Sequence, residues 1–140
     1  MNFDDFITRK IRLDEKLYNV EEKIAALRAR AEKSTTSLSL APGGNAYDDS
    51  RLEELVIRIA DLEAEEEALR KESLGVSAEL STFLSALSDP DEMKVLLLRY
   101  VDLMTVEETA EAMARSKTFV KNKHRSALAA ARLLYRTGSC

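Results

Sequence analysis

The sequence predicts an all-α protein, in which a long antiparallel helical hairpin of the coiled-coil type precedes a C-terminal head of three shorter helices. Three observations support this class. The 140 residues include only 4 Gly and 2 Pro, and 45% are hydrophobic, which favours helices around a sizeable core. Two long segments repeat apolar side chains every seven residues, as coiled coils do. The last third of the chain contains several helix-start signals in quick succession.

The first long helix is predicted over residues 3–31. Its apolar side chains fall into two heptad columns, with Phe3, Leu17, Ile24 and Ala31 in one and Phe6, Leu13, Val20 and Leu27 in the other. Lys10 is the polar exception in this pattern. It either fixes the pairing register of the hairpin or extends its amine to solvent.

Residues 34–50 lose the heptad and gather Ser, Thr, Pro and Gly, so we expect a loop there, centred on Pro42, Gly43 and Gly44. A second, longer heptad helix is predicted from Leu52 to Leu87, with Asp49 or Ser50 as its cap. Pairing of the two helices within the chain is favoured, because closing a loop of this length costs only a few kcal/mol. Pairing with another chain to form a homodimer is the alternative. The predicted domains are therefore a hairpin over 1–88 and a head over 89–140.

Charge divides the chain in a similar way. Residues 1–89 contain 12 basic and 19 acidic side chains, a net of −7, whereas residues 90–140 contain 9 and 6, a net of +3. From Ala112 onward there are seven basic side chains and no acidic one. This asymmetry suits a protein with one end that faces a polyanion.

The head begins with strong helix-start signals. Asp89 is expected to cap a helix with Pro90 at its first position, and this helix should end near Tyr100. Its inner surface is predicted to include Val95, Leu96 and Leu98, while Leu97 and Arg99 point elsewhere.

The stretch from Thr105 to Arg125 is predicted to form a short helix, a tight turn and a basic helix. Thr105 and Glu108 form a capping box, and Ser116 caps the next helix, which starts at Lys117. On that helix Val120, Ala127, Leu128 and Ala131 share the inner face. The opposite face holds a row of hydrogen-bond donors, namely Lys117, Thr118, Lys121, Asn122 and Arg125.

The order of residues from Thr105 to Lys123 resembles the helix-turn-helix of the fourth region of bacterial sigma factors and of related phage regulators. Three positions depart from that pattern: Ala114 stands where a turn glycine is usual, Arg115 replaces an apolar residue, and Phe119 replaces a small hydroxyl residue. An alanine at the turn is more strained than glycine if the turn requires a positive φ. The segments LRARAEKSTTSLS, RLEELVIRIADLEAEEEAL and LLLRYVDLMTVEETAEAM together resemble small phage and prophage proteins related to the ArpU and RinA late transcription regulators.

The resemblance implies a sequence-specific DNA-binding regulator of phage or prophage late genes in a bacterial cytoplasm, with a recognition helix over residues 117–135 in the major groove of double-stranded DNA. We expect Arg115 and Lys117 to contact phosphates near the start of this helix, and Lys123 and Arg132 to contact the DNA backbone on either side. The residues expected to reach base edges are Thr118, Lys121, Asn122 and Arg125.

A protein-interaction module is the alternative, with RNA polymerase or a phage packaging protein as partner, as in a small terminase subunit. An enzyme is the class least favoured. The chain has no Gly-rich phosphate loop and no metal-ligand cluster, and its one histidine, His124, is expected to be packed in the core. Cys140 lacks neighbours suited to metal or nucleophilic chemistry. We therefore predict no catalytic residue, metal or cofactor. The sequence also shows no apolar run long enough to span a bilayer and no signal peptide, which predicts no membrane partner.

Overall fold

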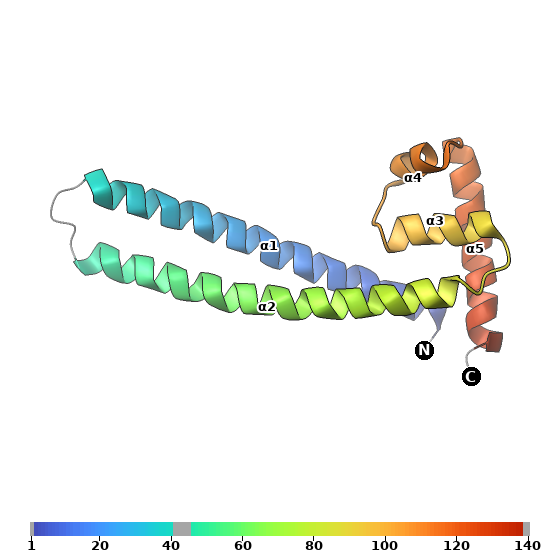
Figure 1. The fold of residues 1–140 in the computed structure, drawn as a ribbon, viewed down its shortest axis with the longest axis horizontal. Coiled ribbons are helices and arrows are strands. Elements are labelled where there is room, and N and C mark those ends of the chain that lie inside the picture. Colours follow the sequence, from blue (N-terminus) through green and yellow to red (C-terminus); the bar gives the residue numbers. More distant parts are fainter. Residues whose placement is uncertain (1, 41–45, 139–140) are drawn as a thin grey trace. The chain divides into compact units, whose positions relative to one another are not determined.

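The computed structural model describes the backbone of residues 2–40 and 46–138, with side chains at 2–33 and 50–138. Within these ranges the fold is all-α, as predicted, and no strand occurs. The helices are α1 (Phe3–Leu40), α2 (Ala46–Leu84), α3 (Pro90–Tyr100), α4 (Val106–Met113) and α5 (Lys117–Gly138) (Figure 1).

The loop predicted over residues 34–50 was wrong at both of its ends. Helix α1 continues to Leu40, and α2 already begins at Ala46, so neither Asp49 nor Ser50 starts the second helix. Ser and Thr lower helix propensity by only a fraction of a kcal/mol per residue, and a long helix can absorb several of them. The predicted turn at Pro42, Gly43 and Gly44 falls outside the described residues.

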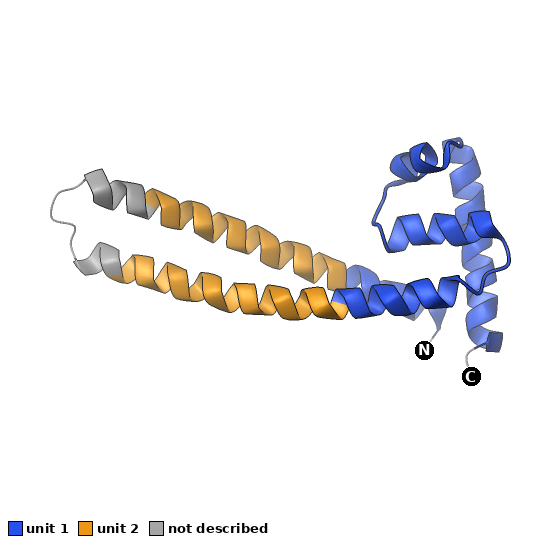
Figure 2. Ribbon diagram, viewed as in Figure 1, with its two compact units in different colours: residues 1–12, 73–140 blue, residues 13–72 orange. Residues whose placement is uncertain are grey.

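The chain divides into two compact units (Figure 2). Unit 1 comprises Met1–Arg12 and Ser73–Cys140, and unit 2 comprises Leu13–Glu72. This division differs from the boundary at residue 89 expected from the sequence. Both long helices cross from one unit to the other, so the first turns of α1 and the end of α2 belong with the three C-terminal helices.

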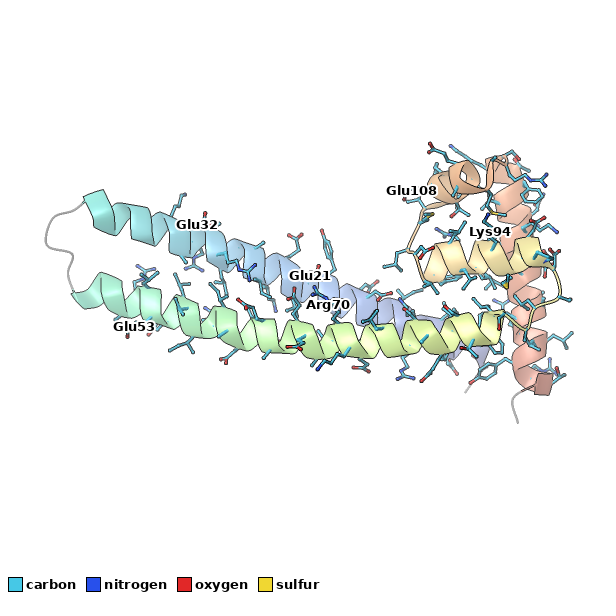
Figure 3. The ribbon with its side chains drawn as sticks, in the orientation of Figure 1. Glu21, Glu32, Glu53, Arg70, Lys94 and Glu108 are labelled. Carbon is cyan, nitrogen blue, oxygen red and sulfur yellow. The ribbon has the colours of Figure 1, made fainter. Side chains whose placement is uncertain are left out.

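Unit 2 is the paired part of the two long helices. Arg28 binds Glu63 at 3.1 Å, and Arg70 binds Glu21 at 3.3 Å, so later residues of α1 meet earlier residues of α2, and the pairing is antiparallel (Figure 3). Four of the predicted heptad side chains of α1 are buried in this unit, namely Leu13, Val20, Ile24 and Leu27, whereas Leu17 and Ala31 are half-buried. Their counterparts on α2, Leu55, Ile59, Leu62 and Leu69, are only half-buried.

Unit 1 has a core to which four helices contribute. Buried side chains come from α1, α2, α3 and α5: Phe3, Ile7, Leu80, Leu84, Leu96, Ala127 and Ala131. Phe3 stacks on Phe83 with ring centroids 5.5 Å apart, and Tyr135 meets Phe83 edge-on at 5.6 Å. The first turn of α1 is therefore part of the core that supports α5.

Two side chains in unit 1 bear on the sequence interpretation. Lys10 is only 1% exposed, which excludes the alternative in which its amine extends to solvent. Leu97, expected to point away, packs against the main core because that core also receives α1 and α2, which the local pattern of α3 does not reveal.

A second, smaller core joins α3, α4 and α5. Val95, Ala110 and Val120 are buried there, and Val106 and Met113 pack against them. Val106, Ala110 and Met113 therefore form the inner face of α4. Small Ala110 sits where α4 and α5 approach each other, as the crossing of two helices joined by a tight turn requires.

The helix starts follow the sequence signals closely. The Asp89 carboxylate accepts from the backbone N–H of Asp91 at 2.9 Å, with Pro90 as the first helical residue. Thr105 and Glu108 form the expected reciprocal capping box, at 3.1 and 3.0 Å. Of the helices in the described ranges, none combines the length and apolar character needed to cross a membrane.

Candidate nucleic-acid interface

Helix α5 is amphipathic, and its buried and exposed faces contain the residues that the sequence predicted for each. Val120, Ala127 and Ala131 are fully buried on its inner face. Five polar or basic side chains are exposed on the opposite side: Lys117, Thr118, Lys121, Asn122 and Arg125. Because one face is held by the two cores of unit 1, the other can present its donors from a rigid element.

The turn before α5 positions the start of this row. Helix α4 ends at Met113 and is capped by Ala114, whose φ of 54° and ψ of 44° place it in the left-handed region. The backbone N–H of Arg115 then donates to the carbonyl of Ala110 at 2.9 Å, which closes the helix end. The Ser116 hydroxyl accepts from the N–H of Phe119 at 3.1 Å and caps α5, as predicted.

Four exposed side chains of the row are free to bind an external group. Thr118, Lys121, Asn122 and Arg125 form no hydrogen bond or ion pair with any side chain or backbone group that the structure describes. They lie at spacings of three and four residues along α5, so they follow one another along the same face. Their groups supply one hydroxyl, one amide and two cations.

The remaining predicted site residues have partners within unit 1. Lys117 lies 3.7 Å from Glu107, an exposed pair that solvent screens strongly. Lys123 binds Asp89 at 2.8 Å, and Arg132 binds Asp4 at 3.0 Å. Lys123 and Arg132 therefore brace α5 against the starts of α3 and α1, a role that the sequence analysis missed because these partners lie 34 and 128 residues away.

The Asp89–Lys123 pair shifts the titration of both groups. The hydrogen bond from Lys123 holds the pKa of Asp89 below its usual value, assisted by the N–H groups of Asp91 and Glu92. The same hydrogen bond raises the pKa of Lys123. Both groups are therefore charged at neutral pH, and the cap of α3 is also an anchor for α5.

Phe119 lies beside the donor row in an unusual setting. It is half-buried, yet it is not among the hydrophobic side chains that pack against either core of unit 1. The Arg115 guanidinium lies 4.7 Å from the centre of its ring, and the Lys123 amine lies 5.9 Å from it. A cation–π contact of this kind holds Arg115 near the start of α5 with its charge still exposed.

His124 is packed in the protein, as expected. Its Nε2 lies 2.8 Å from the Tyr100 hydroxyl, and burial lowers the pKa of the imidazole, with Arg99 and Arg132 adding to the effect. Burial also raises the pKa of Tyr100. The pair links α3 to α5. In the described part of the chain, no group of His, Cys, Asp and Glu side chains is arranged to hold a metal ion.

Comparison of the sequence with protein-family models gives no match, and neither the curated proteins nor the solved structures compared with the chain yield one. The proposal for this site therefore depends on its geometry and chemistry.

Proposed function

We propose that the protein is a sequence-specific regulator that binds double-stranded DNA with the N-terminal half of α5 in the major groove. The observation that carries the proposal is the row of unpaired donors on a helix whose opposite face is fully buried. The major groove admits an α-helix, and base edges there are bound by such donors. The N-terminal residues of a recognition helix are those that contact bases.

The residues of the row have complementary roles in this proposal. Asn122 matches adenine, which offers one acceptor and one donor in the major groove, and Lys121 and Arg125 match the two acceptors of guanine. Thr118 adds a hydroxyl at the start of the helix. Arg115 and Lys117 lie next to the start of α5, where they would bind phosphate.

The roles that we propose for Lys123 and Arg132 differ from the contacts with the DNA backbone that the sequence suggested. Both are held by carboxylates at distances of 2.8 and 3.0 Å, so their net contribution to phosphate binding is smaller than that of an unpaired cation. We propose that they mainly fix the orientation of α5 while the unpaired cations bind the duplex.

The biological setting that we propose comes from the resemblance of the chain to small phage and prophage proteins related to the ArpU and RinA late transcription regulators. We propose that the protein controls late genes of a phage or prophage inside a bacterial host. The supporting features are the capping box at Thr105, the tight turn at Ala114 and the basic second helix, which all occur in the order that the resemblance requires.

Selection of bound fragments from random DNA, followed by titration at several salt concentrations, tests the proposal. The four cations that the proposal places at the duplex, Arg115, Lys117, Lys121 and Arg125, should give a log–log salt slope of about −3 to −4. Selection should also enrich one short motif. Binding that is independent of salt, or no binding to any duplex, would refute the proposal and favour a protein partner such as RNA polymerase or a packaging protein.

A further inference from the structure

The two edges of the helix pair in unit 2 differ in chemistry. Along one edge, Arg28 binds Glu63 and Glu21 binds Arg70 across the pair. Glu63 and Arg70 are seven residues apart, so they share one side of α2, next to its leucine stripe. Along this edge, ion pairs therefore link the two helices.

The other edge is open and basic. A cavity of about 420 Å³ lies there between α1 and α2. Three cations and one carboxylate line it beside apolar side chains: Lys23, Arg30, Arg58 and Asp61, with Ala26, Leu27 and Leu62. A second cavity of about 150 Å³ shares Arg30 and Arg58, and it is also lined by Arg51, Glu54 and Leu55. Cations of both helices therefore face the same space, where they outnumber the carboxylates Asp61 and Glu54 and leave a net positive charge.

Three of these cations have no partner of their own among the described residues. Lys23, Arg30 and Arg58 make no hydrogen bond or ion pair with any group in the described ranges, although carboxylates are abundant on both helices. Leu62 of the first cavity and Leu55 of the second are also only half-buried. An apolar strip with unmatched cations beside it fits an amphipathic helix that carries carboxylates.

The sequence of α2 supplies such a helix. At seven-residue intervals it places Arg51, Arg58, Glu65 and Glu72, so all four lie on one side, the side that lines the cavities. Glu65 and Glu72 are exposed and have no partner in the described chain. The two basic positions come first along the chain and the two acidic positions follow. When two copies of α2 lie antiparallel, the basic half of one column therefore faces the acidic half of the other.

We propose that a second copy of this chain docks on the open edge, with its α2 antiparallel to the first. A two-fold axis between residues 61 and 62 places Arg58 opposite Glu65 of the other copy. Because such an interface is isologous, this pair forms twice. The half-buried leucines of α2 are covered at the same time. The proposal is independent of DNA binding.

Sedimentation equilibrium of the full chain over a range of concentrations tests the pairing. The unaltered protein should show a reversible monomer–dimer equilibrium. Arg58→Glu and Glu65→Arg should each raise the dimer dissociation constant about tenfold or more, since symmetry counts each change twice. The double variant Arg58→Glu/Glu65→Arg should return to within about threefold of the unaltered protein, because the pair is restored with reversed polarity.

The two single variants change the net charge in opposite directions, which separates the specific pair from general repulsion. Weakening by both supports the pairing, whereas opposite effects on dimerisation would overturn it. A monomer at every concentration, with helicity retained by circular dichroism, would also overturn it. As a readout of register, Asp61→Cys in a Cys140→Ser background should give covalent dimers with a short thiol crosslinker, and Glu53→Cys should not, because Glu53 lies on another side of α2.

Discussion

Ala114 shows how a single residue sets the geometry of the candidate site. Its φ of 54° is a conformation that glycine adopts freely and alanine only at a cost of about 1 to 2 kcal/mol. The sequence analysis recognised that an alanine replaces the usual turn glycine, and the structure shows that the turn does require a positive φ. The strain is tolerated because the cores on both sides hold α4 and α5 in place.

Ala114→Gly should therefore stabilise the protein by about 0.5 to 1 kcal/mol, the relief of strain less the extra entropy of glycine in the unfolded chain. Urea denaturation followed by circular dichroism measures the change. Ala112→Gly is the matched control, since Ala112 is exposed inside α4, and it should destabilise by about 1 kcal/mol. Destabilisation by both changes would contradict the strained turn.

The lowered pKa of Asp89 leads to a second prediction at the scale of single residues. Its folded pKa is depressed, so it contributes stability above the usual carboxyl range, near pH 4, and this contribution is lost as the pH falls through the lower folded value. Asp89→Asn should therefore destabilise the protein at pH 7 and make less difference at pH 3.

Urea unfolding at the two pH values measures the effect. Asp102→Asn removes an exposed carboxylate with no hydrogen-bond partner among the described residues, and should change the free energy of unfolding little at either pH. If the cost of Asp89→Asn is the same at pH 7 and pH 3, the ion pair with Lys123 is not the source of the stability.

At the scale of elements, the signals encoded within a few residues were predictable. The capping box at Thr105, the Asp89–Pro90 start and the Ser116 cap each depend on groups two or three residues apart. The extent of α1 and α2 was not predictable in this way. Ser and Thr between residues 34 and 40 suggested a loop, but their weak effect on propensity does not stop an established helix.

The helix start at Phe3 was predicted, but the side chains that the first turn of α1 packs against were beyond local inference. Chain termini commonly fray, yet Phe3 is 1% exposed and stacks on Phe83. Phe3→Ala should destabilise the protein by about 3 to 5 kcal/mol. Tyr18→Ala, on the same helix but 61% exposed, should cost less than about 1 kcal/mol. Equal effects in thermal or urea unfolding would show that the terminus does not contribute to the core.

At the scale of the whole molecule, the predicted fold class is confirmed, while the division into units is set by contacts between residues far apart in sequence. Phe3 and Ile7 meet Leu84 and Ala131 in one core, so the C-terminal helices depend on both ends of the chain. A heptad pattern cannot reveal this, because it shows only that a face is buried and not what buries it. The same limit applies to the site: the donor row was predictable from helical spacing, and the anchors at Asp4 and Asp89 were not.

The measurement that tests the central claim most directly is the salt dependence of duplex binding by two lysine variants. Lys121 is unpaired on the exposed face of α5, and Lys94 is an exposed lysine of α3 in the same unit (Figure 3). Fluorescence anisotropy with a selected duplex should show that Lys121→Ala weakens binding and makes the log–log salt slope less steep by about one unit. Lys94→Ala should leave both unchanged. Equal effects of the two substitutions, or no effect of either, would contradict a DNA-binding face on α5.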